Sequence, residues 1–135
     1  NLNSLSDGAE NLYLSNSSRC FEVNTDDLSS FKCRVFEGPR HDPYNKLINI
    51  MQTPHYRFLL GYTEEYSNYI SRYLGTGLRS LYSTDKYTKL IHSFKTTNFP
   101  PILVKQSAKH VCIVDGLHRA SISLFMAKPV NAVYI

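Results

Sequence analysis

The chain has 135 residues, the usual size of one domain and enough to bury a core without disulfides or metals. Hydrophobic residues make up 42% of it and charged residues 19%, a balance that excludes an intrinsically disordered chain. The formal net charge of +4 is uneven, because residues 81–135 hold seven Lys/Arg against two Asp/Glu; this excess suits an anionic partner, although no clustered basic run marks a nucleic-acid arm.

The first third of the chain predicts an N-terminal arm and two strands. Residues 1–18 are rich in Asn, Ser and Gly, so we expect a weakly ordered arm. Residues 20–23 form a short strand candidate, and residues 31–36 alternate apolar with basic side chains, which favours a second strand after a turn at 26–28. Glu37-Gly38-Pro39-Arg40-His41 then ends the second strand with a turn.

The middle of the chain predicts helices. Asp42-Pro43 places a capping residue before a proline, which predicts a helix over 43–52. Thr53-Pro54 interrupts it, and a longer helix is expected over 55–74, stopped by Gly75-Thr76-Gly77. Large side chains recur every three or four residues along this second helix, a spacing typical of a packed helix face. They are Phe58, Tyr62, Tyr66, Tyr69, Ile70 and Tyr73.

The last third predicts a helix capped by Thr84 or Asp85 and then strands around a further helix. We expect strands over 102–104, 111–114 and 130–135, with a helix over 117–127. The whole pattern predicts an α+β fold. A single domain over 19–135 would contain a small mixed β-sheet with packed helices, and residues 43–83 would be a helical elaboration of it.

The cysteine spacing and the hydropathy of the chain indicate the cellular compartment. Cys20, Cys33 and Cys112 share no C-x-x-C spacing and leave an odd one over, which argues against a disulfide framework or a zinc site. The sequence contains no run of about 18 apolar residues and its first residues lack the features of a signal peptide. We therefore expect a cytoplasmic protein without a membrane partner.

The junction at Asp115-Gly116 is the motif best suited to chemistry. A buried strand that runs directly into a helix brings free backbone N–H groups and the positive end of the helix dipole to one point. Gly116 lacks a Cβ, so a phosphate can approach the main chain, and His118 and Arg119 can add side-chain donors. Each residue type is also common at a helix start for structural reasons alone.

The order of motifs from Tyr87 to Ile135 resembles the ParB/sulfiredoxin superfamily. A helix leads to the strand Pro101-Ile102-Leu103-Val104, a hairpin returns as Ile113-Val114-Asp115-Gly116-Leu117-His118-Arg119, and a closing strand follows Pro129. The resemblance implies a ParB/sulfiredoxin-like sheet and a nucleotide whose phosphates lie at the start of the helix.

Individual branches of the superfamily resemble the chain to different degrees. Sulfiredoxins carry a nucleophilic cysteine where this sequence has Leu117, and Cys112 lies in a predicted buried strand, so sulfinic acid reductase activity is not expected. Chromosome-partitioning ParB proteins carry an Arg-rich motif and a helix-turn-helix domain that this sequence does not contain. The free serine kinases, with their D-G-x-H-R pattern, are the most similar.

That resemblance implies a nucleotide-dependent phosphotransferase that acts on a small hydroxyl-bearing metabolite. ATP or ADP, or alternatively CTP, would bind with Mg²⁺, and Gly116, His118 and Arg119 would contact the phosphates. Asp115 would orient the loop or hold Mg²⁺. Glu37 is the candidate general base, with a solvated loop carboxylate as the equally valid alternative. Arg40 and His41, in the same loop, are candidates for additional phosphate contacts.

Two alternatives stay open at this point. The first is a ParB-like nucleotide-binding or nuclease module acting on or beside nucleic acid, which the basic C-terminal part allows. The second is a non-catalytic member of the fold that binds a protein partner through its tyrosine-rich helices. His55, His92 and His110 have no partner at metal-ligand spacing and are interpreted as surface or packing residues.

Overall fold

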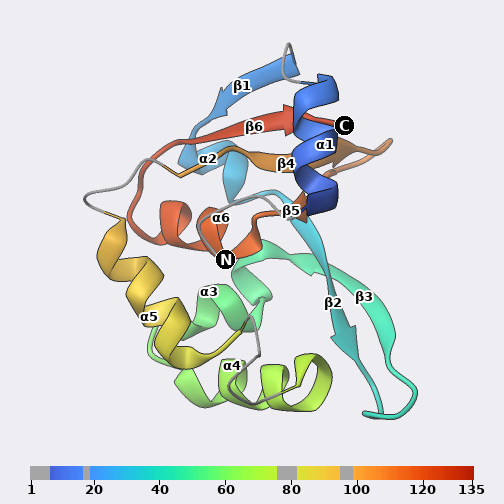
Figure 1. The fold of residues 1–135 in the computed structure, drawn as a ribbon, viewed down its shortest axis with the longest axis vertical. Coiled ribbons are helices and arrows are strands. Elements are labelled where there is room, and N and C mark those ends of the chain that lie inside the picture. Colours follow the sequence, from blue (N-terminus) through green and yellow to red (C-terminus); the bar gives the residue numbers. More distant parts are fainter. Residues whose placement is uncertain (1–6, 17–18, 76–81, 95–98) are drawn as a thin grey trace.

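The computed structural model describes residues 7–16, 19–75, 82–94 and 99–135. Within these residues a six-stranded mixed sheet is surrounded by helices (Figure 1). The elements in chain order are α1 (Asp7–Asn16), β1 (Cys20–Val23), α2 (Thr25–Leu28), β2 (Lys32–Glu37), β3 (Tyr44–Asn49), the 3₁₀ turn η2 (Ile50–Gln52), α3 (Pro54–Leu59), α4 (Thr63–Tyr69), the π-helical turn η3 (Ile70–Leu74), α5 (Thr84–Ser93), β4 (Ile102–Gln106), β5 (Val111–Asp115), α6 (Leu117–Phe125) and β6 (Val130–Tyr134).

The strand order across the sheet is β1-β6-β4-β5-β2-β3. β4 runs parallel to β6 and β5 runs parallel to β2, whereas the other neighbouring pairs are antiparallel. β2 pairs with β5 only at Lys32 and Cys33, so β2 runs on to Glu37 after β5 has ended, whereas the end of β5 lies beside the start of β4. α6 begins directly after the end of β5, beside the start of β4.

Alternating side chains divide the sheet into two faces. One face carries the main core, with Val104 and Ile113 packed beneath α2, α6 and η2. The other face is covered over β4 and β6 by α1, where Tyr13 packs against Leu103 and Val133. Figure 1 shows α1 lying across this side of the sheet, and the β2–β3 hairpin extending away from the other strands.

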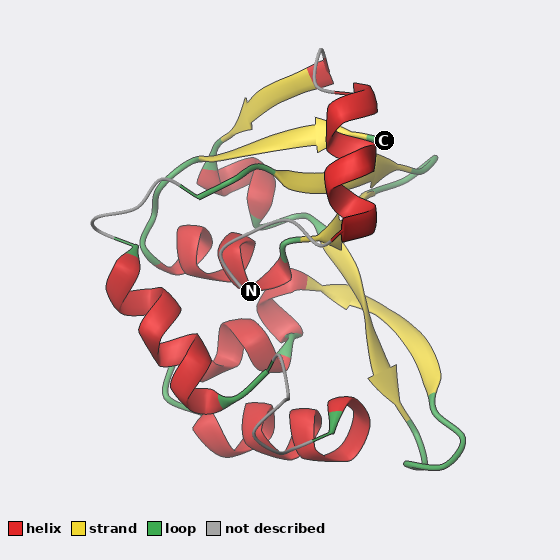
Figure 2. Cartoon of the chain, in the orientation of Figure 1, coloured by secondary structure: helices red, strands yellow, loops and turns green. Residues whose placement is uncertain are grey.

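A second core joins the helices on the far side of α6. The side chains of Tyr66, Ile70, Tyr87, Leu90 and Ile122 are buried together in it. Figure 2 shows these helices grouped below the strands, so that α6 lies between the sheet and the helical layer. The aromatic repeat that predicted a packed helix face is confirmed for Tyr66, whereas Tyr62 is 52% exposed.

The predicted sheet is confirmed: segments 102–104, 111–114 and 130–135 share one mixed sheet, and the 117–127 helix packs on it. The helix predicted over 43–52 is wrong, because Tyr44–Asn49 is a strand that pairs with β2 along its whole length. Pro43 suits a turn as well as a helix start, and the cross-strand pairing decides between them. The helical elaboration of 43–83 is thus corrected at its beginning.

Three further expectations are corrected locally. The turn at 26–28 is the end of a short helix, α2, capped by Asn24 through a 2.8 Å hydrogen bond from Asp27 N to Asn24 Oδ1. The long helix over 55–74 is broken at Gly61, whose φ of 108° is a left-handed conformation that favours glycine. The arm over 1–18 contains α1. Parts of the predictions fall on residues 1–6, 17–18, 76–81 and 95–98, which lie outside the described residues.

No helix in the described residues is long and apolar enough to cross a bilayer.

Candidate functional site

The junction between β5 and α6 consists of a single residue. β5 ends at Asp115, α6 begins at Leu117, and Gly116 between them has φ 97° and ψ 27°. A Cβ on Gly116 would lie 2.7 Å from Ile102 Cγ2 and 2.9 Å from Arg119 Nη2. Both the backbone conformation and the available space therefore require glycine here.

The N-terminus of α6 carries no side-chain cap. Gly116 O accepts the first intrahelical bond from Ala120 N at 2.8 Å, but Gly116 has no side chain that could accept from the amides of the first turn. Such amides, aligned with the helix dipole, can bind an anion.

Arg119 is buried, with 1% of its surface exposed, and both terminal nitrogens donate to protein oxygens. Nη1 donates to the carbonyl oxygens of Pro100 and Pro101 at 2.9 and 3.1 Å, and Nη2 donates to Asp115 Oδ2 at 2.9 Å. Burial lowers the pKa of Arg119, and the charge of Asp115 opposes that shift. Arg119 thus ties the ends of three segments together instead of pointing outward from the helix, as a phosphate-gripping side chain would.

His118 is also turned inward. Its Nε2 lies 2.8 Å from the hydroxyl of Tyr66, and its ring centroid lies 4.6 Å from that of His55 and 4.9 Å from that of Tyr87. Burial lowers the pKa of His118 well below its ordinary value, and His55 and Arg119 lower it further. His118 is therefore a neutral core residue at neutral pH, and a phosphate contact through Nε2 would require the bond to Tyr66 to break.

The remaining predicted residues lie on the β2–β3 hairpin. Glu37 ends β2, and its carboxylate is 3.3 Å from Lys46 Nζ with 45% of the side chain exposed. Arg40 and His41 lie in the exposed turn between β2 and β3. Glu37 lies four residues beyond Cys33, the last residue of β2 that pairs with β5, and no hydrogen bond recorded for the described residues joins it to Asp115.

The predicted residues thus separate into two groups. Asp115, Gly116 and Arg119 form one contact network at the junction, whereas Glu37, Arg40 and His41 lie on the hairpin. Comparisons with models of protein families, with curated proteins and with solved structures gave no match. The function of the junction must therefore be argued from its geometry.

Metal binding at the junction would depend on one carboxylate. In the described residues no group of three His, Cys, Asp or Glu side chains is arranged to hold a metal ion. Asp115 is 26% exposed and uses Oδ2 for Arg119. A single carboxylate fits Mg²⁺ only when substrate phosphates and water complete the octahedral shell.

Sequence reasoning did not identify the partners that hold Arg119 and His118. The carbonyl groups of Pro100 and Pro101 and the hydroxyl of Tyr66 belong to segments distant in sequence, and nothing local marks them. One signal was present: Asp115 and Arg119 are four residues apart, the spacing of an ion pair along a helical turn. That spacing favours an internal role for Arg119.

Proposed function

We propose that the protein binds a nucleotide by its phosphates at the N-terminus of α6 and transfers a phosphoryl group to a small hydroxyl-bearing metabolite. The observation that carries the proposal is the uncapped start of α6 immediately after β5. The resemblance of Asp115-Gly116-Leu117-His118-Arg119 to the D-G-x-H-R pattern of free serine kinases points to the same place.

In this proposal the backbone, rather than the side chains, contacts the phosphates. The backbone N–H groups of Leu117, His118 and Arg119 point toward the N-terminus of α6, where the helix dipole favours negative charge. The two buried side chains hold α6 in position, His118 through Tyr66 and Arg119 through Asp115 and the proline carbonyls. A site whose donors are fixed before the ligand arrives needs little reorganisation to bind it.

Asp115 is the residue that would hold Mg²⁺ beside the phosphates. Arg119 fixes one of its oxygens, and the partial exposure of the side chain leaves the carboxylate accessible. The ion would neutralise phosphate charge during transfer. Glu37, on the β2–β3 hairpin, is the candidate base for the acceptor hydroxyl, and its carboxylate lies 3.3 Å from Lys46 Nζ.

Binding is tested by titrating the protein with ATP, ADP and CTP, with and without Mg²⁺, in a calorimeter. Asp115→Asn keeps an oxygen for Arg119 but removes the charge, so affinity in Mg²⁺ should fall about tenfold or more, while affinity without Mg²⁺ changes little. Asp85→Asn, at the exposed start of α5, is the matched control and should bind as the wild type does. Absence of binding by all three nucleotides would refute the proposal.

Catalysis is tested separately with Glu37→Gln in a phosphoryl-transfer assay, using free serine, related amino acids and sugar alcohols as acceptors. Loss of a general base commonly lowers the rate about 10²–10⁴-fold, while nucleotide affinity should be unchanged. Glu64→Gln, an exposed glutamate of α4, is the control and should keep full activity. If Glu37→Gln transfers phosphate at the wild-type rate, Glu37 is not the base.

A further inference from the structure

The face of the sheet opposite the main core is covered unevenly. α1 packs over β4 and β6, where Tyr13 contacts Leu103 and Val133. Further across the same face, Arg34 of β2 is exposed and Cys112 of β5 is half-buried. The outer strands β5, β2 and β3 therefore present an accessible surface beside α1.

Strand register assembles a row of basic side chains on this face. Lys105 pairs with Cys112 across β4 and β5, and Cys112 pairs with Lys32 across β5 and β2, so all three side chains lie on one side of the sheet. Arg34 lies two residues beyond Lys32 on the same side, opposite Leu47 of β3. Arg34 and Lys105 are exposed, and neither forms an ion pair among those recorded for the described residues.

The acidic residues of the hairpin do not neutralise this row. Glu37 lies an odd number of residues from Arg34, so it points to the opposite face, where it pairs with Lys46. Asp42 lies in the turn beyond the strands. Outside this row, the positions of β2 and β3 that share the face of Arg34 are apolar or amide side chains, so the hairpin contributes only positive charge to this face. Asp115, which pairs with Leu103 at the end of β5, is bound by Arg119.

Aromatic rings adjoin the far end of the row. Phe36, on the same face as Arg34, stacks on Tyr73 with ring centroids 5.7 Å apart, and Arg72 lies 5.7 Å from the Tyr73 ring. Tyr73 also donates to Gly38 O at 2.6 Å, and Tyr69 accepts from Phe36 N at 3.1 Å. These two bonds hold β2 in place beyond the end of β5, so the surface is stiff.

We propose that this face binds single-stranded nucleic acid, with phosphates contacting Lys105, Lys32 and Arg34 and a base meeting the aromatic rings of Phe36 and Tyr73. The cations are spread over two strand spacings of about 4.8 Å and along about 7 Å of β2. A single phosphate cannot contact all of them, but a chain of phosphates can. Positive charge beside aromatic rings is the combination that single-strand-binding surfaces use. The proposal does not rest on the nucleotide site, which is formed by the N-terminus of α6.

The test is the fluorescence anisotropy of a labelled mixed-sequence single-stranded oligonucleotide, measured over a series of salt concentrations. Each cation that contacts a phosphate contributes about 0.7 to the slope of log affinity against log salt. Arg34→Gln and Lys105→Gln should each lower the magnitude of the slope by about that amount, and the double variant by about twice as much. Tyr73→Ala should weaken binding at least about fivefold.

Matched controls distinguish this face from general attraction. Lys46→Gln removes a cation from the opposite face of the same hairpin, and Lys89→Gln removes an exposed cation from α5; both should leave the slope unchanged. Circular dichroism of each variant confirms that it is folded. Three results would each overturn the proposal. They are no binding at low salt, equal slope changes for the variants of Arg34, Lys105, Lys46 and Lys89, and competition by polyglutamate as strong as competition by the unlabelled oligonucleotide.

Discussion

Arg119 carries a charge in a place from which water is excluded, and such a charge is tolerated only with its partners in place. Arg119 donates to three acceptors. One is the carboxylate of Asp115 at the end of β5, and the other two are the carbonyl oxygens of Pro100 and Pro101, just before β4. At the scale of one residue, this guanidinium explains why β5, β4 and α6 meet where they do. Together with Ile102 Cγ2, it also leaves no room for a side chain on Gly116.

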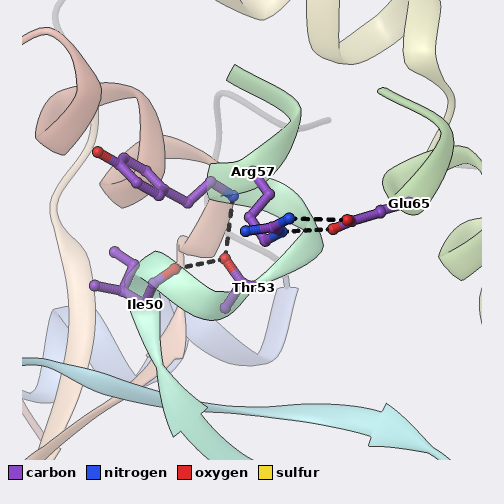
Figure 3. Close-up of polar contacts among 5 residues, drawn as sticks. Ile50, Thr53, Arg57 and Glu65 are labelled. Carbon is purple, nitrogen blue, oxygen red and sulfur yellow. Dashed lines mark hydrogen bonds and ion pairs between the residues drawn. The ribbon is translucent and has the colours of Figure 1, made fainter. Parts of the chain in front are cut away.

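Replacing Arg119 by Met should therefore lower the free energy of unfolding by about 3–5 kcal/mol, because the buried proline carbonyls and Asp115 lose their donor while the volume is kept. Urea denaturation followed by circular dichroism measures it. Arg57→Met is the control: Arg57 binds Glu65 at 2.7 and 3.0 Å on the surface (Figure 3), and an exposed pair contributes little. Equal losses in both variants would contradict the role assigned to Arg119.

At the scale of elements, Thr53 connects η2 to α3. Its Oγ1 donates to Ile50 O at 2.7 Å and accepts from Tyr56 N at 3.1 Å (Figure 3), and the residue is fully buried. Thr53→Val keeps the shape but leaves Tyr56 N without its acceptor, whereas Ile50 O keeps the 3.2 Å bond from Thr53 N, so the free energy of unfolding should fall by about 1 kcal/mol. Thr53→Ser retains the hydroxyl and should recover most of this in the same urea experiment. If Thr53→Ser lowers the free energy of unfolding as much as Thr53→Val does, the packing of the methyl group matters here and the hydroxyl cap does not.

Elements with strong local signals were predictable from the sequence. The apolar runs of β4, β5 and β6 predicted most of the sheet, because the hydrophobic pattern of each strand and the turn-forming residues at its ends gave the same boundaries. β3 was not predictable, since Asp42-Pro43 begins a helix or a turn equally well and only pairing with β2 selects the strand. The break at Gly61 was missed because an isolated glycine is tolerated in many helices.

At the scale of the whole molecule, α6 lies between two cores. Ala120 packs toward the sheet and Ile122 toward the helices, so His118 and Arg119 are buried although they are polar. The periodicity of 117–127 predicts one packing face and an opposite exposed face. Nothing in the local pattern reveals that a helical layer covers the second face, so the outward direction expected for the side chains of His118 and Arg119 was wrong.

The buried histidines should make the stability of the whole molecule sensitive to acid. Burial lowers the pKa of His55 to about 3, and burial also lowers the pKa of His118 well below its ordinary value. Below about pH 6.5 the unfolded chain therefore binds a proton at each imidazole ring, whereas both rings stay neutral in the native state. The groups around them are tyrosines and Arg119, which offer no compensating carboxylate.

Stability should therefore be constant between about pH 6.5 and pH 8 and fall on acidification by about 1.4 kcal/mol per pH unit for each histidine, or about 4 kcal/mol for both between pH 7 and pH 5. Urea unfolding at several pH values measures this dependence. His55→Phe keeps a ring where His55 Nδ1 has no partner in the described residues, so it should remove about half of the dependence. His92→Gln, at the exposed end of α5, should leave it unchanged. A pH profile for His55→Phe as steep as that of the wild type would mean that other groups govern the response to acid.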